Sequence, residues 1–157
     1  MKKQFAVLLL TAISTWAGTP DYLLPLKRPD VKQGIHVIEQ KTADDGLEHS
    51  LIILPTTSYL GEVGTCDRDK ITIPEDAIAF VHTHPDPLAY QPSPQDIQDE
   101  IRLAKIHPGF IMYVAGIQRI GYNNGIGMWY ISVITSDGQV HSGGYIDRNW
   151  ATTTKRP

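Results

Sequence analysis

The chain has little cysteine, no excess of basic residues and no long apolar segment after its first residues. Its single cysteine, Cys66, excludes an intrachain disulfide, so a hydrophobic core must hold the 157 residues together. The 14 Lys and Arg residues are fewer than the 17 Asp and Glu residues and are scattered, which argues against a nucleic-acid partner. With 41% hydrophobic residues and no internal repeat, the composition indicates one ordinary globular domain.

The longest apolar run lies at the N-terminus. Lys2 and Lys3 precede the sequence "FAVLLLTAISTWAG" (5–18), which is followed by a polar region. This run is shorter than the roughly 20 residues that a bilayer requires. We therefore expect a signal peptide over residues 1–17, cleavage after Ala17, and export to the periplasm or the exterior without a stable membrane span after processing.

Prolines and glycines divide the rest of the chain. We expect an extended lead-in over 18–34 and then one domain over 35–157. Alternation and apolar runs predict one helix, which begins after Ser93, and a series of strands. The predicted strands are 35–42, 47–54, 59–65, 70–73, 77–84, 110–116, 127–135 and 140–146. This order predicts an α+β fold with a mixed central sheet and a flanking helix.

The stretch "HTHPDPLAYQPSPQD" (82–96) carries the strongest functional signal. On a strand, side chains two residues apart share a face, so His82 and His84 should project together. Ser93 is placed as the N-cap of the following helix, and Asp96 falls in its first turn, where the loop can fold it back onto the imidazoles. Two nitrogens and one carboxylate oxygen are the ligands of a catalytic zinc site.

Each of these residues also has an ordinary structural explanation. Ser93 and Asp96 make a good helix start without any metal, and His82 and His84 could be partly solvated residues at a strand end. However, the spacing H-x-H-x8-S-x2-D should arise by chance in roughly one such chain per thousand. The spacing therefore favours a zinc site over the competing hypothesis, an exported binding domain without metal.

The same stretch resembles the H-[ST]-H-P-x7-S-x-x-D signature of the JAMM, or MPN+, zinc metallopeptidases, a family that includes deubiquitinating enzymes and bacterial JAB-domain proteins. The matching residues are His82, Thr83, His84, Pro85, Ser93 and Asp96. The resemblance implies a cytidine-deaminase-like JAB/MPN fold over about 35–135 and hydrolysis of peptide or isopeptide bonds. It also implies Zn²⁺ on His82, His84 and Asp96, with Ser93 bonded to the oxyanion formed during attack.

The family further uses an upstream glutamate as general base, and three glutamates are candidates. We favour Glu48, because it begins a strand that runs into the core, whereas Glu39 and Glu62 remain alternatives. Leu88 and Tyr90, in the proline-rich loop beside the predicted zinc site, are expected to contact the substrate.

Export changes the substrates that the resemblance suggests. An exported protein would not meet cytosolic ubiquitin in its own envelope, so we expect a peptide or protein substrate, such as an envelope protein or a cell-wall peptide. The alternative function is a zinc-binding but catalytically inactive JAB/MPN-like scaffold or interaction module.

Overall fold

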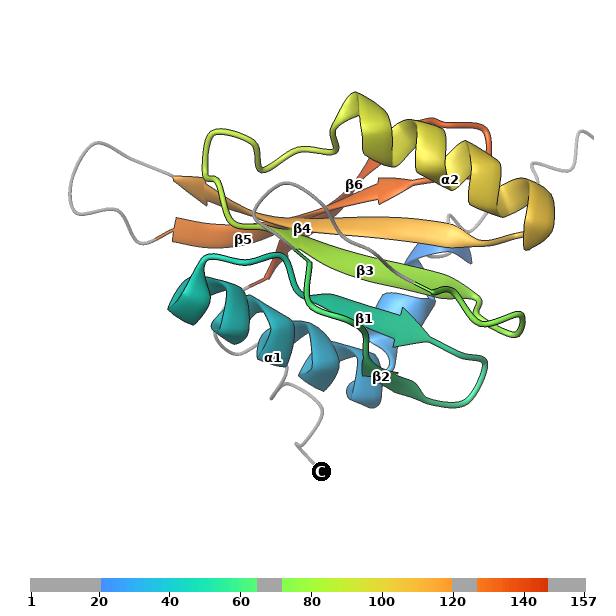
Figure 1. The fold of residues 1–157 in the computed structure, drawn as a ribbon, viewed down its shortest axis with the longest axis horizontal. Coiled ribbons are helices and arrows are strands. Elements are labelled where there is room, and N and C mark those ends of the chain that lie inside the picture. Colours follow the sequence, from blue (N-terminus) through green and yellow to red (C-terminus); the bar gives the residue numbers. More distant parts are fainter. Residues whose placement is uncertain (1–20, 65–71, 120–126, 147–157) are drawn as a thin grey trace, which may run out of the picture.

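The computed structural model describes residues 21–64, 72–119 and 127–146, and there the chain forms one mixed sheet with a helix on each face (Figure 1). The predicted α+β class is confirmed. The expected signal peptide and Cys66 lie outside the described residues. The elements are η1 (Asp21–Leu23), η2 (Pro25–Lys27), α1 (Pro29–Asp45), β1 (Ser50–Ile53), β2 (Ser58–Leu60), β3 (Ala79–His84), α2 (Pro94–Ile106), β4 (Ile111–Arg119), β5 (Gly127–Ile134) and β6 (Val140–Ile146).

The strand order is β2-β1-β3-β4-β5-β6, which places β3 near the middle of the sheet. β3 and β4 are parallel, whereas every other neighbouring pair in the described sheet is antiparallel. Parallel neighbours cannot be joined by a tight turn, and α2 supplies the crossover between them. The N-terminus of α2 therefore returns to the end of the sheet where β3 stops, as Figure 1 shows.

The prediction of a strand over 35–42 was wrong, because these residues belong to α1. The buried residues of α1 recur at helical spacing, and this period prevails over the local alternation that suggested a strand. They are Val31, Ile35, Ile38, Glu39 and Thr42. The sequence "ADDG" is likewise the end of this helix and no hairpin turn, since Gly46 takes a left-handed conformation with φ of 71° and its N–H bonds the carbonyl of Thr42.

The extended lead-in over 18–34 was also wrong for the residues that the structure describes. Residues 21–34 hold two short 3-10 turns and the first part of α1. Pro29 occupies the first helical position, where its fixed φ and missing N–H favour helix initiation. The prolines of this region therefore start helical turns instead of keeping the chain extended.

The remaining predicted strands correspond to β1, β2, β3, β4, β5 and β6, with ends that differ by a few residues. The exception is the predicted strand 70–73. Its first two residues lie outside the described part of the chain, and the other two belong to no strand. The helix after Ser93 is confirmed as α2, but α1 makes two α-helices in the described residues where we expected one.

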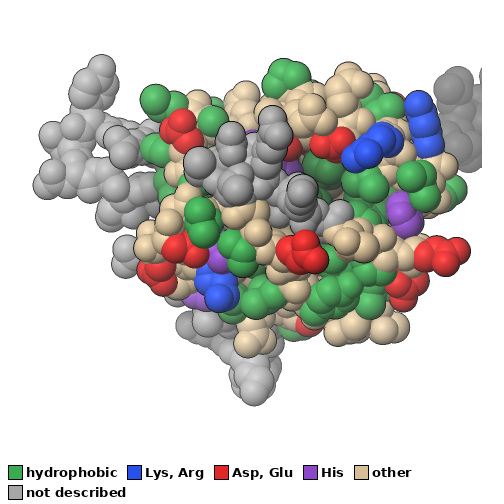
Figure 2. Space-filling model, in the orientation of Figure 1, with side chains coloured by type: hydrophobic (Ala, Val, Ile, Leu, Met, Phe, Trp, Pro, Cys, Tyr) green, Lys and Arg blue, Asp and Glu red, His purple; other side chains and the backbone are tan. Residues whose placement is uncertain are grey.

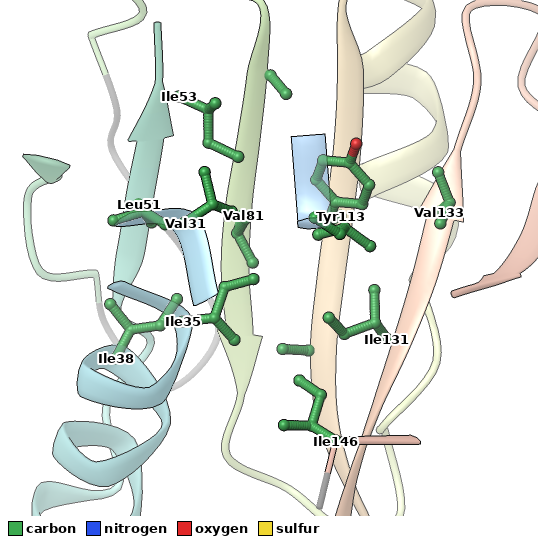
Figure 3. Close-up of a cluster of buried hydrophobic side chains, with 13 residues drawn as sticks. Val31, Ile35, Ile38, Leu51, Ile53, Val81, Tyr113, Ile131, Val133 and Ile146 are labelled. Carbon is green, nitrogen blue, oxygen red and sulfur yellow. The ribbon is translucent and has the colours of Figure 1, made fainter. Parts of the chain in front are cut away.

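Two apolar clusters fill the faces of the sheet, and Figure 3 shows the one beneath α1. There, Ile35 and Ile38 pack from the helix onto Leu51, Val81 and their neighbours from the strands. The second cluster lies beneath α2 and includes Ile52, Phe80, Met112, Val114 and Ile134. Alternate residues of β3 enter the two clusters, so each face of this strand has a separate environment.

Candidate metal centre

β3 brings its two histidines to the α2 side of the sheet, as their spacing predicted. Phe80, two residues earlier, stacks on His82 with ring centroids 5.4 Å apart. The Nε2 atoms of His82 and His84 lie 3.2 Å from one another, and both residues are buried. The strand thus presents two imidazole nitrogens to one point.

The first turn of α2 fixes the carboxylate that meets them. The Oγ of Ser93 accepts a hydrogen bond from the backbone N–H of Asp96 at 3.2 Å, and the Ser93 N–H donates to Oδ2 of Asp96 at 2.6 Å. This reciprocal capping box confirms Ser93 as the N-cap. It holds Asp96 Oδ1 at 3.2 Å from Nε2 of His82, and Oδ2 at 3.4 Å from Nε2 of His84.

These separations fit a tetrahedral zinc ion. Ligand atoms about 2.0–2.1 Å from such an ion lie about 3.3 Å from one another. The Nε2–Nε2 and Nε2–carboxylate distances are 3.2–3.4 Å. Among the described residues, His82, His84 and Asp96 form a group whose ligand atoms all lie within 4.8 Å of one another, so this group could hold a metal ion.

A backbone carbonyl orients His84. Its Nδ1 lies 2.7 Å from the carbonyl oxygen of Ala89, in the loop that joins β3 to α2. Only a protonated Nδ1 can donate to a carbonyl, so in the neutral ring Nε2 carries the lone pair that faces Asp96. Zinc-binding histidines generally make such a bond, which fixes the tautomer and the ring plane.

The Asp96 carboxylate and the His84 imidazole shift one another's pKa values. Burial by itself would raise the pKa of Asp96, but the hydrogen bonds from His82 and His84, the charge of His82 and the bond from the Ser93 N–H hold that pKa well below its usual range. Burial would likewise lower the pKa of His84, whereas Asp96, the Ala89 carbonyl and the nearby Glu48 raise it above 6.5. These interactions favour a cation between the three groups.

Strand pairing brings Glu48 to the same place. Ser50 pairs with His82, and the antiparallel ladder continues to the bond from the Thr83 N–H to the His49 carbonyl at 3.0 Å. One further step in this register sets Glu48 opposite His84 and on the same face of the sheet. Glu48 is buried, and its carboxylate is near enough to contribute to the raised pKa of His84.

The two alternative glutamates differ from Glu48 in their surroundings. Glu39 is buried on α1, one turn before Thr42, whose hydroxyl meets that of Thr83 on the opposite side of β3 from the imidazoles. The sheet therefore separates Glu39 from the metal group. Glu62 is exposed, and its backbone carbonyl accepts a hydrogen bond from Ser50 Oγ at 3.0 Å.

The two residues expected to contact substrate lie in the loop beside the group but differ in exposure. Leu88 is 91% exposed. The ring of Tyr90 is half-buried and meets the ring of Tyr130 edge-on, with centroids 6.2 Å apart. Leu88 is therefore accessible to another molecule, whereas Tyr90 packs against β5.

Two structural features were missed, and the first of them belongs to the site. The Ala89 carbonyl belongs to the backbone, so no residue type in the sequence marked it. Glu100, one helical turn after Asp96, is completely buried, and its carboxylate has no hydrogen-bond partner within the described ranges. Its spacing of four residues from Asp96 is a signal that could have placed it on the sheet side of α2.

Comparison with known proteins adds no assignment. No protein-family model matches the chain, and no curated protein matches its sequence. None of the described helices combines the length and the apolar character needed to cross a membrane. On the face drawn in Figure 2, the acidic, basic and apolar side chains of the described residues are interspersed.

Proposed function

We propose that this protein is a zinc-dependent hydrolase of the JAMM type that cleaves peptide or isopeptide bonds. The observation that carries the proposal is the convergence of His82, His84 and Asp96 on one point, with Glu48 and Ser93 beside them. Two imidazoles and one carboxylate leave a tetrahedral zinc ion one position for water or substrate. The resemblance of residues 82–96 to the JAMM signature supplies the reaction class.

The chain's own groups have distinct roles in this proposal. Bound zinc would supply Lewis-acid activation of water and polarisation of the scissile carbonyl. Glu48 accepts the proton of the attacking water and returns it to the leaving amine. The hydroxyl of Ser93, whose oxygen already accepts the Asp96 N–H, can donate its own hydrogen to the developing oxyanion.

The proposed substrate is an exported peptide or protein, such as an envelope protein or a cell-wall peptide. The apolar N-terminal run supports export, and the exposed Leu88 supports contact with a substrate next to the metal group. The JAB/MPN-like, cytidine-deaminase-like fold is part of the same proposal. It is supported by the mixed sheet with a helix on each face.

Metal analysis tests the proposal directly. We expect about one zinc per wild-type chain and none in a His84→Ala, Asp96→Ala double variant. Folding of the variant is checked by circular dichroism. A wild-type chain that neither contains zinc nor takes it up from solution would refute the proposal. Stoichiometric zinc without hydrolysis in a screen of peptide and isopeptide substrates would instead support the inactive scaffold.

A further inference from the structure

One row of residues crosses the sheet at the end that holds the metal group. In the strand registers, His84 of β3 pairs with Gly116 of β4, and Gly116 pairs with Tyr130 of β5. Paired residues of neighbouring strands point to the same face, so this row belongs to the α2 side. Two and four residues before Gly116, β4 presents the larger side chains of Val114 and Met112 to that face.

The loop between β3 and α2 occupies the space that a side chain at Gly116 would fill. A Cβ atom added there would lie 2.3 Å from the carbonyl oxygen of Tyr90, 2.5 Å from its Cα and 2.7 Å from its carbonyl carbon. All three are backbone atoms, which cannot turn aside as the end of a flexible side chain can. Any larger residue at position 116 must therefore displace the loop.

The displaced segment is the one that orients His84. Tyr90 directly follows Ala89, whose carbonyl accepts the hydrogen bond from Nδ1 of His84 at 2.7 Å. Toward the start of the loop, the backbone N–H of Ala89 donates to the Asp86 carbonyl at 2.9 Å and closes a turn. The ring of Tyr90 meets Tyr130, the residue paired with Gly116. The turn before Ala89 and the ring contact after it therefore both hold the loop in place.

We propose that Gly116 is a positioning residue of the metal site, because its lack of a side chain lets the loop lie against β4 and bring the Ala89 carbonyl to His84. The inference rests on the proposed function only in assuming that the site binds zinc. Gly116 has no side chain that could bind metal or substrate, although its backbone pairs with that of His84. It acts through Tyr90 and Ala89, and losing such an outer contact typically weakens metal binding about 10–100-fold.

The test compares zinc affinity, measured by competition with a chelating dye, for the wild-type chain and two variants. We expect Gly116→Ala to weaken binding about 10–100-fold and to alter the visible spectrum of the cobalt-substituted protein. Gly143→Ala is the matched control. In this β6 glycine a Cβ atom would lie 2.7 Å from Cγ2 of Ile131, so the variant crowds another part of the sheet. It should lower the melting temperature but keep the zinc affinity and the cobalt spectrum.

Equal zinc affinity of Gly116→Ala and wild type would overturn the inference, and so would an equal loss in Gly143→Ala. If Gly116→Ala does not fold, Tyr90→Ala serves instead, because it removes the ring contact with Tyr130 without changing β4. We expect it to weaken zinc binding by a smaller factor, and unchanged affinity would again overturn the inference. A wild-type chain without zinc affinity would refute the proposed function itself, so the two failures are distinguishable.

Discussion

The two faces of β3 differ in chemistry although they belong to the same six residues. Ala79, Val81 and Thr83 face α1, where two of them join an apolar cluster and the third bonds Thr42. Phe80, His82 and His84 face α2, and the two histidines belong to the metal group. Because side chains alternate along the strand, one face of β3 packs in the core and the other contributes to the metal group. Stability and metal binding should therefore respond to different substitutions.

A buried glutamate on each helix extends the comparison. Glu39 on α1 and Glu100 on α2 are both nearly inaccessible, and burial raises the pKa of each carboxyl to about 8. Glu48, in contrast, is buried and interacts with His84, whose pKa its charge helps to raise. Of these three, only Glu48 has surroundings that suit a general base.

The largest expected effect is on turnover, which Glu48→Gln should reduce and Glu39→Gln should not. On a substrate found by screening, we expect turnover to fall about 10²–10⁴-fold, because the general base is removed. Glu39→Gln, on the other side of the sheet, should keep turnover near the wild-type value. Zinc content, measured in parallel, should be unchanged in both variants.

An equal loss of turnover in Glu39→Gln and Glu48→Gln would contradict the view that catalysis is confined to the α2 side of the sheet. A wild-type rate in Glu48→Gln with zinc still bound would remove Glu48 as the base and leave Glu62 as the remaining candidate.

Shortening one side chain in each apolar cluster should distinguish effects on stability from effects on zinc affinity. Ile38→Ala in the cluster beneath α1 should lower the free energy of unfolding by about 2–5 kcal/mol, with unchanged zinc affinity of the folded protein. Phe80→Ala should lower it by about 3–5 kcal/mol and also weaken zinc binding, because the ring stacks on His82. Urea unfolding and dye competition measure the two quantities. Equal zinc affinities in the two variants would contradict the comparison.

The buried glutamates predict how stability depends on pH. The folded-state pKa of Glu39 is about 8, above its ordinary value of 4.5, so between these values the folded chain keeps a proton that the unfolded chain releases. Stability should therefore fall as pH rises from about 4.5 to 8 and then level off. Each pKa unit corresponds to about 1.4 kcal/mol, so the total is at most a few kcal/mol for each glutamate.

Glu39→Gln and Glu100→Gln should each make this decline smaller, while differing little from the wild-type chain near pH 4. Urea unfolding of the metal-free protein between pH 4 and pH 9 measures the effect. An unchanged slope in both variants would show that neither carboxyl is protonated in the folded state.

Thr83→Val should give the smallest effect. The Thr83 hydroxyl accepts the His49 N–H at 2.8 Å and lies 2.5 Å from the hydroxyl of Thr42. Loss of these bonds leaves buried polar groups unsatisfied and should lower the free energy of unfolding by about 1–3 kcal/mol. Zinc affinity should stay at the wild-type value, and a loss of zinc together with stability would show that the two faces are coupled.

Local patterns determined much of the candidate site. The period of two residues on a strand placed His82 and His84 on one face, and helix capping placed Ser93 and Asp96 in the turn that meets them. These patterns succeed because each is an interaction between residues close in sequence. The same reasoning failed over 35–42, where alternation over a few residues resembled a strand although burial follows the period of a helix.

The sequence by itself determined the α+β class and brought two histidines and an aspartate within reach of one another, because strand alternation and helix capping are local. Only the tertiary structure showed that Glu48 lies near His84, because that depends on the pairing of β1 with β3. It also decided the roles of the Ala89 carbonyl and Gly116. A backbone oxygen and a missing side chain leave no residue pattern, so their contacts become visible only when distant segments are packed together.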